Sequence, residues 1–161
     1  MRTTRRGLIV AGGVAAFPVG ARAAPRSDGQ VLEELLGLER RLEEAYDAAL
    51  RRDAVAEGLG RRLLEQEREH ARGLELLLNA RGRRSPEAFV RDPGLTRGLR
   101  DRQAFTRYAL DLERRAVQAY VAAAAGVGDG GVRERLGAIM ASEAQHEVAL
   151  RDSLGEPLLG V

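Results

Sequence analysis

The chain has 161 residues, a length that fits one domain with a sizeable hydrophobic core. It contains no cysteine, which excludes disulfides, thiolate metal sites and redox thiols. Its formal net charge is +2, but residues 1–24 carry four arginines and no acid, so the rest of the chain has 22 basic and 24 acidic residues. A nearly neutral domain does not favour nucleic-acid binding.

The first 24 residues have the organisation of an export signal. The pair Arg5-Arg6 precedes an apolar stretch that runs to Gly20, and Ala21-Arg22-Ala23 supplies the small-x-small pattern of a cleavage site. The segment resembles a twin-arginine signal peptide, and its apolar run is too short and too rich in glycine for an ordinary transmembrane helix. We therefore expect a signal peptide over residues 1–24 and one domain over residues 25–161. Export would be to the periplasm, the cell envelope or the extracellular space.

Four amphipathic helices are predicted after the signal, because Ala, Leu, Glu and Arg dominate and apolar residues recur every three or four positions. We expect them over about residues 28–52, 54–80, 98–125 and 132–154. The predicted inward-facing positions are Leu32, Leu35, Glu39, Leu42, Tyr46, Ala49, Leu63, Glu67, His70, Leu74, Leu77, Phe105, Ala109, Glu113, Ala116, Tyr120, Ala123, Val132, Leu136, Ile139, Glu143, His146 and Leu150.

The two histidines of the chain occur in the same motif. Each follows a glutamate by three residues, as Glu67 and His70 in the second expected helix and as Glu143 and His146 in the fourth. Residues three apart lie on the same face of a helix. Each motif therefore presents one carboxylate and one imidazole to the interior of the bundle.

A second pattern, Leu-Glu-Arg-Arg followed by Ala-Tyr, occurs in the first and third helices. It contributes Glu39 with Tyr46, and Glu113 with Tyr120. The two copies of this pattern are separated along the chain by almost the same interval as the two Glu-x-x-His motifs. The halves of the chain are therefore expected to be related by a pseudo-two-fold axis.

Four glutamates and two histidines thus occupy positions where leucine would normally stand. Burying an unpaired carboxylate costs on the order of several kcal/mol, so something must compensate. Two divalent cations would balance the four negative charges if the imidazoles are neutral. The alternative is a bundle whose buried polar side chains satisfy one another.

The spacing also predicts the topology. Glu39 and Glu67 lie equally far along the chain from the first turn, one before it and one after it. Glu113 and Glu143 are placed in the same way about the last turn, so each hairpin brings its pair to one level. Residues 81–97 can span roughly 55 Å when extended, against about 40 Å for a helix of about 27 residues. We therefore expect an all-α four-helix bundle of two antiparallel hairpins joined by a long crossover.

These motifs resemble those of the ferritin-like superfamily over about residues 28–154, and most of all those of exported ferritin-like and rubrerythrin-like proteins with a carboxylate-bridged dimetal site. The resemblance implies a ferritin-like bundle that binds two iron or manganese ions. Tyr46 matches a tyrosine that the family places seven residues after its first glutamate, and Tyr120 repeats it. We interpret both as hydrogen-bond partners of carboxylates. The metal ligands that the resemblance implies are Glu39, Glu67, His70, Glu113, Glu143 and His146.

Two functional hypotheses follow. In the first, the protein is a ferroxidase, peroxidase or catalase-like oxidoreductase that acts on Fe(II), O2 or hydrogen peroxide. In the second, it is a non-catalytic protein that sequesters metal or stabilises the cell envelope under oxidative stress. Glutamate and histidine suit both iron and manganese. We expect metal ions and a small oxidant as partners, neither nucleic acid nor a membrane span after signal cleavage, and leave a homodimer open.

Overall fold

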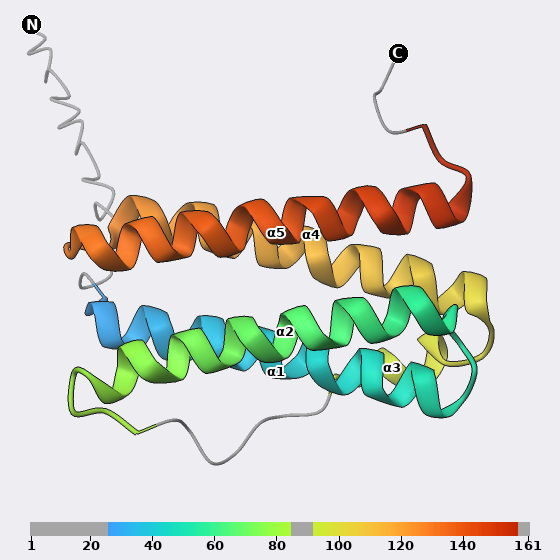
Figure 1. The fold of residues 1–161 in the computed structure, drawn as a ribbon, viewed down its shortest axis with the longest axis horizontal. Helices are drawn as coiled ribbons and strands as arrows, with labels where there is room; N and C mark the ends of the chain where they lie inside the picture. The colour runs from blue at the N-terminus through green and yellow to red at the C-terminus, as the bar shows by residue number, and fades with distance from the viewer. Residues whose placement is uncertain (1–25, 85–91, 158–161) are drawn as a thin grey trace, which may run out of the picture.

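The computed structural model describes residues 26–84 and 92–157, and the expected signal peptide lies outside them. Four long helices and one short one make up the described part of the chain, and no strand occurs in it. They are α1 (Asp28–Arg51), α2 (Glu57–Asn79), α3 (Leu95–Gly98), α4 (Arg102–Gly126) and α5 (Gly130–Leu154). The long helices run along a common axis, so the predicted all-α bundle is confirmed (Figure 1).

The bundle consists of two antiparallel hairpins. Helix α1 packs along α2, and α4 packs along α5, while α1 and α4 make the main contact between the hairpins. Helix α2 ends at one end of the bundle, whereas α3 and the start of α4 lie at the other (Figure 1). The chain between α2 and α3 therefore connects opposite ends, as the predicted crossover requires.

Side-chain caps fix where three of the long helices begin. Ser27 and Gln30 form a reciprocal capping box at the start of α1. Asp101 accepts a hydrogen bond from the Ala104 amide at the start of α4, and Asp129 caps α5 in the same way. Each cap satisfies backbone donors that the first helical turn leaves without an intrahelical partner.

Helix α2 begins slightly later than the sequence pattern predicted, at Glu57 rather than near residue 54. Asp53 has a left-handed backbone with φ of 53°, and Ala54 and Val55 are buried at 3% exposure each. The chain turns these two apolar side chains under the end of the hairpin before α2 begins. Gly60 leaves room for Val55, because a Cβ at position 60 would lie 2.6 Å from Val55 Cγ1.

Helix α4 also begins later than predicted, at Arg102 rather than near residue 98. Residues 95–98 form the separate short helix α3, whose Leu95 is buried against the bundle. Asp101 is extended and caps α4, so the backbone changes direction between the two helices. The predicted helix continues across this break, although polar residues interrupt the apolar spacing between Leu99 and Ala104.

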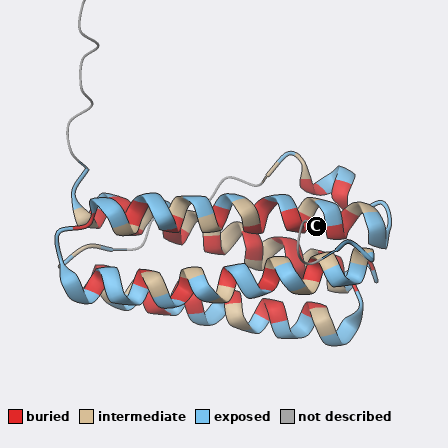
Figure 2. Cartoon of the chain, turned by 90° about the horizontal axis from the view of Figure 1, so that it is seen from above, coloured by how far each residue is buried: buried red, intermediate tan, exposed pale blue. Residues whose placement is uncertain are grey.

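The core has two apolar layers with polar residues between them. One layer, at the α1–α2 turn, includes Leu42, Ala49 and Phe105, and the other, at the opposite end, includes Leu32, Leu36 and Leu136. Buried positions follow one face of each long helix (Figure 2). Full burial of each large apolar side chain contributes about 1.5–3 kcal/mol to folding.

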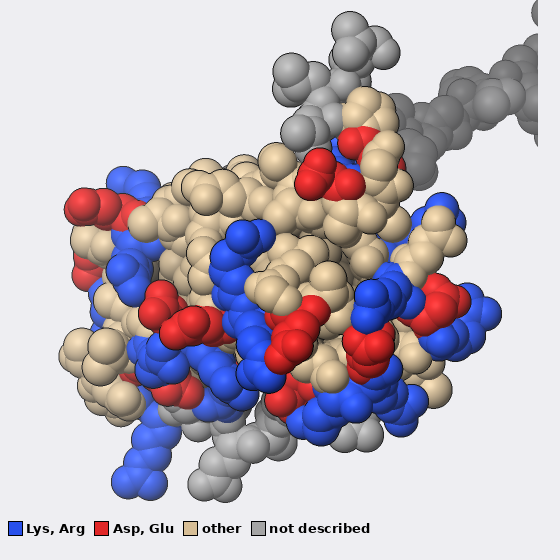
Figure 3. Space-filling model, turned by 45° about the vertical axis from the view of Figure 1, so that its right-hand side comes forward, with Lys and Arg blue, Asp and Glu red and all other residues tan. Residues whose placement is uncertain are grey.

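The predicted inward-facing positions are buried with one exception. Leu77 is only half-buried, and its neighbour Leu78 is fully buried in its place. On the outside, basic and acidic side chains are interspersed over the lower part of the face shown in Figure 3. Within the described residues, no helix is both long enough and apolar enough to span a bilayer.

Candidate metal centre

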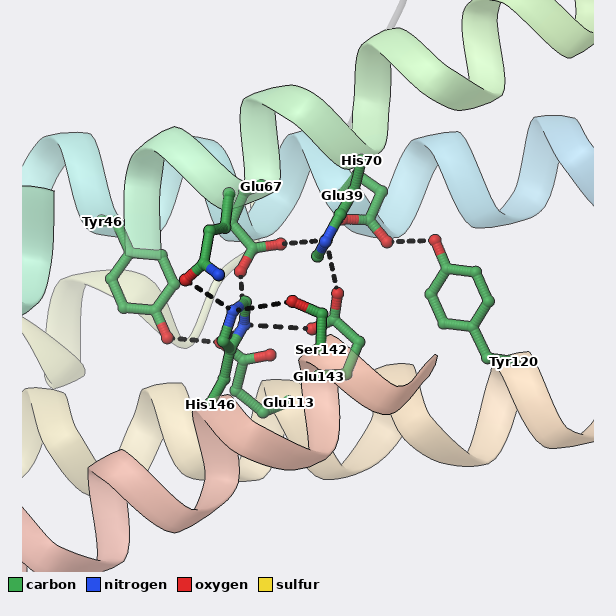
Figure 4. A network of polar contacts seen from close by, with 10 residues as sticks. Glu39, Tyr46, Glu67, His70, Glu113, Tyr120, Ser142, Glu143 and His146 are labelled. Atoms are coloured by element: carbon green, nitrogen blue, oxygen red, sulfur yellow. Dashed lines mark hydrogen bonds and ion pairs between the residues drawn. The ribbon is translucent and has the colours of Figure 1, made fainter. Parts of the chain in front are cut away.

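The six predicted site residues meet in the polar layer between the two apolar layers. Helices α1 and α4 contribute one glutamate each, and α2 and α5 each contribute a glutamate and a histidine one turn apart (Figure 4). The four glutamates are completely buried, and the two histidines are 8% and 2% exposed. The residues brought together are Glu39, Glu67, His70, Glu113, Glu143 and His146.

The cluster divides into two overlapping groups of four side chains. Within each group, one atom from every residue lies within 4.8 Å of the others, a spacing that could hold a metal ion. Glu67 and Glu143 belong to both groups. We call the group completed by Glu39 and His70 the His70 position, and the group completed by Glu113 and His146 the His146 position.

At the His70 position, the imidazole Nδ1 points into the cluster. It lies 2.7 Å from Glu143 Oε1, 3.5 Å from Glu39 Oε2 and 3.7 Å from Glu67 Oε2. The hydroxyl of Tyr120 on α4 donates a hydrogen bond to the other oxygen of Glu39 on α1. Tyr120 therefore fixes one carboxylate oxygen and leaves the second directed at the imidazole.

The His146 position has the same kinds of donors on the other hairpin, but here the tyrosine bonds the same glutamate oxygen that faces the imidazole. His146 Nδ1 lies 2.9 Å from Glu67 Oε1, 3.4 Å from Glu143 Oε2 and 3.5 Å from Glu113 Oε1. The hydroxyl of Tyr46 on α1 donates to Glu113 on α4. The predicted hydrogen bonding of both tyrosines to carboxylates is therefore present, and each bond links one hairpin to the other.

The side chains of this cluster lie close together, but most of their inward-facing atoms do not form hydrogen bonds with one another. Both histidine Nδ1 atoms and six glutamate oxygens are buried without a hydrogen-bond partner among the described residues. Buried polar atoms normally have such a partner, and leaving one without costs about 1–3 kcal/mol. The nitrogen and oxygen atoms instead converge from several sides. That arrangement fits a shared cation better than a polar core that satisfies itself.

Burial and mutual proximity change the proton affinities of these groups. Desolvation raises the pKa of Glu39 and of Glu113 well above the ordinary value. Burial opposes protonation of the histidines, but the surrounding carboxylates outweigh it and raise the pKa of His70 to about 11 and of His146 to about 12. Without a cation, protons thus take over part of the charge compensation.

Sequence reasoning missed two polar neighbours of the cluster. His146 Nε2 lies 3.2 Å from Gln66 Oε1 and 3.4 Å from Ser142 Oγ. Gln66 directly precedes Glu67, and Ser142 directly precedes Glu143, so the two are equivalent positions in the repeated motif. Their place beside the motif was the available signal, but their proximity to one particular histidine depends on how the hairpins pack.

A model of the ferritin-like domain family matches residues 27–156 of the chain. The chain belongs to this family, and the ferritin-like fold predicted from its motifs is confirmed. Searches of curated proteins and of solved structures each returned no match. The fold and the buried carboxylate–histidine cluster together fit a dimetal carboxylate protein.

Proposed function

We propose that the six clustered side chains bind two iron or manganese ions and that the protein is an oxidoreductase acting on Fe(II), O2 or hydrogen peroxide. The observation that carries this proposal is the set of eight buried, convergent nitrogen and oxygen atoms without hydrogen-bond partners. The buried carboxylates among them require positive charge at the centre of the cluster to compensate their negative charge. Two divalent cations would balance four carboxylates beside neutral imidazoles.

The donor atoms favour these metals over softer ones. Carboxylate oxygen and imidazole nitrogen suit iron and manganese, and the chain has no cysteine that would select a thiophilic metal. When bound, the two ions would supply the one-electron changes that reduction of O2 or peroxide requires. The protein's part is to hold carboxylates in place, with Glu67 and Glu143 common to both positions.

The tyrosines support this role by orienting the carboxylates that are not shared. Tyr120 holds Glu39, and Tyr46 holds Glu113, each through one oxygen. The second oxygen of each glutamate remains available inside the cluster. Burial of all four glutamates limits the water that could compete as a ligand.

Metal analysis tests the binding part of the proposal. Purified protein loaded with Fe(II) without oxygen, or with Mn(II), should hold two ions per chain, in line with the two groups of donors. Glu67→Gln should lower this number, because Glu67 serves both positions. Glu69→Gln, on the exposed face of the same helix, is the matched control and should leave it unchanged. Folded wild-type protein that retains almost no metal would overturn the assignment.

Turnover separates an enzyme from a sequestering protein. Loaded protein is given many equivalents of Fe(II) with O2, or of hydrogen peroxide, while iron oxidation or O2 release is followed. An enzyme continues well beyond the amount of metal bound. If the reaction stops after the bound ions have reacted once, with both metals and both substrates, the alternative of a metal-sequestering or envelope-stabilising protein is favoured.

We also propose that the protein is exported through the twin-arginine pathway. The support is the order of the arginine pair, the apolar stretch and the cleavage pattern that ends at Ala23. Replacing Arg5 and Arg6 together with Lys should leave the precursor inside the cell, whereas Arg2→Lys should not. Normal export of the double variant would contradict the assignment. The N-terminus of the exported protein, read by mass spectrometry, should lie close to Ala23.

A further inference from the structure

The two positions of the cluster have the same kinds of inward-facing residues, but the outward-facing nitrogens of their histidines have different surroundings. Each position has one histidine, one glutamate held by a tyrosine and the same two shared glutamates. Behind His146, Nε2 has the amide oxygen of Gln66 at 3.2 Å. Among the hydrogen bonds of the described residues, none involves Nε2 of His70.

The motif repeat explains this difference. The residue equivalent to Gln66 in the second Glu-x-x-His motif is Ser142, whose side chain is shorter. Ser142 Oγ lies 3.4 Å from Nε2 of His146, one turn on in its own helix, and is not bonded to His70. The serine hydroxyl and the glutamine amide thus both contact the same imidazole (Figure 4 shows Ser142 beside His146).

The histidines also differ in their access to solvent. The side chain of His146 is 2% exposed, whereas that of His70 is 10% exposed. His70 therefore forms an edge of the cluster that reaches the surface. The hydrogen-bonded histidine lies on the closed side, and the histidine without such a bond lies on the open side.

An outer hydrogen bond of this kind determines how an imidazole binds a cation. Because Nδ1 of His146 faces the cluster, binding through Nδ1 requires the proton to reside on Nε2. The Gln66 oxygen accepts that proton in a hydrogen bond, which fixes the tautomer, holds the ring orientation and makes Nδ1 more basic. Among the described residues, no hydrogen-bond acceptor fixes the outward-facing Nε2 of His70 in this way.

We propose that Gln66 is a positioning residue that makes the His146 position the tight divalent-cation site, and that the solvent-edged His70 position is the weaker one, through which cations exchange. The inference rests on the proposed function, since it requires two bound ions. It extends that function by giving the two ions different roles. The ion at the His146 position would stay bound. The His70 position would exchange its ion, so Fe(II) would enter there as a substrate.

Calorimetric titration of Mn(II) into the metal-free protein tests the proposal. Wild type should show two classes of site, with His146→Ala removing the tight class and His70→Ala removing the weak one. Gln66→Leu, which keeps the side chain's bulk but removes its acceptor, should weaken the tight class by about 10- to 100-fold and leave the weak class in place. Gln66→Glu retains an acceptor and should restore tight binding. Gln145→Leu, on the exposed face beside His146, is the matched control.

Histidine NMR supplies a measurement that a general loss of packing would not reproduce. The chain has two histidines, so the ring nitrogen spectrum of the Zn(II)-loaded protein contains two imidazole systems. One Nε2 proton, that of His146, should exchange slowly with water, and Gln66→Leu should make it fast. Two equal sites in wild type, or a Gln66→Leu protein in which both classes or neither class weakens, would overturn the inference while the two-ion proposal stands. Wild type that binds no metal would overturn the two-ion proposal itself.

Discussion

The polar layer and the two apolar layers of this bundle are equally buried, yet they contribute to stability in opposite ways. Leu36 and Leu74, in one apolar layer, and Glu39, in the polar layer, are all 0% exposed. Burial of the leucines stabilises the fold whatever is bound. Burial of the glutamate costs free energy unless a positive charge or a proton accompanies it. The apolar layers therefore hold the bundle together, and the polar layer makes its stability depend on protons and cations.

The largest expected effect is the pH dependence of the stability of the metal-free protein. The pKa values of His70 and His146 are raised to about 11 and about 12, and those of Glu39 and Glu113 are raised by burial. The folded state therefore binds more protons than the unfolded chain once the pH exceeds the ordinary pKa values. For each additional proton that the folded state binds, the free energy of unfolding falls by about 1.4 kcal/mol for every unit by which the pH rises.

The melting temperature of the metal-free protein should consequently fall as the pH is raised from about 5 to about 9. Cations displace these protons, so metal affinity should rise over the same range. Melts of metal-loaded protein at the same pH values are the control and should decline much less. A metal-free melting temperature that stays constant or rises with pH would contradict a buried, cation-free carboxylate cluster.

An apolar layer should respond to truncation regardless of metal. Leu74→Ala removes a fully buried side chain and should cost about 2–5 kcal/mol in the free energy of unfolding, because the cavity is only partly refilled. Leu76→Ala on the same helix is the matched control, because Leu76 is 70% exposed, and should change stability by less than about 0.5 kcal/mol. Denaturant unfolding with and without metal measures both. If bound metal abolished the destabilisation caused by Leu74→Ala, the apolar layer would not contribute to stability independently of metal, contrary to the comparison made above.

The polar layer should respond in the opposite direction when its charge is removed. The double variant Glu39→Leu with Tyr120→Phe removes the carboxylate together with the hydroxyl that it binds, so no new partnerless donor is created. In metal-free protein the double variant should be as stable as wild type or more stable by about 1–4 kcal/mol. With metal, wild type should become the more stable of the two. A metal-free double variant that melts well below wild type would show that Glu39 is not a burden in the cation-free state.

The smallest expected effect concerns one hydrogen bond. Tyr46→Phe frees the oxygen of Glu113 that the hydroxyl holds, and should weaken metal binding at the His146 position by about 10- to 100-fold. Tyr108→Phe is the control, because Tyr108 packs beside Phe105 and contributes nothing to the cluster. Competition with a chelator measures the affinity. If the two substitutions changed the metal affinity equally, the proposed role of Tyr46 in orienting Glu113 would be wrong.

The candidate site was predictable because its residues break a local rule. Glu39, Glu67, Glu113 and Glu143 stand on apolar faces, and helical periodicity alone reveals such an anomaly. Equal spacing from the turns then predicts that they meet, and the structure brings them together. Their role as metal ligands, like the export signal over residues 1–24, stays a prediction.

Several features of the site could not be read from the sequence. Tyr46 could have bonded either glutamate of its own hairpin, but its partner is Glu113 across the bundle. Likewise, nothing in the motif indicates that Glu67 and Glu143 are the shared pair, or that Nδ1 faces inward. These are relations between helices, set by the distance and rotation at which the hairpins pack.

Helical periodicity is a local property of the chain. The four long amphipathic helices, the faces that they bury and the six polar residues on those faces were therefore predictable without the structure. The start of α2 at Glu57, the division between α3 and α4, and the unequal surroundings of His70 and His146 were decided by tertiary structure. At the start of α2 and around the histidines, the deciding contacts join residues from different elements. Val55 turns under the hairpin because the bundle end offers it a buried site, and Gln66 reaches His146 because α2 and α5 face each other across the core.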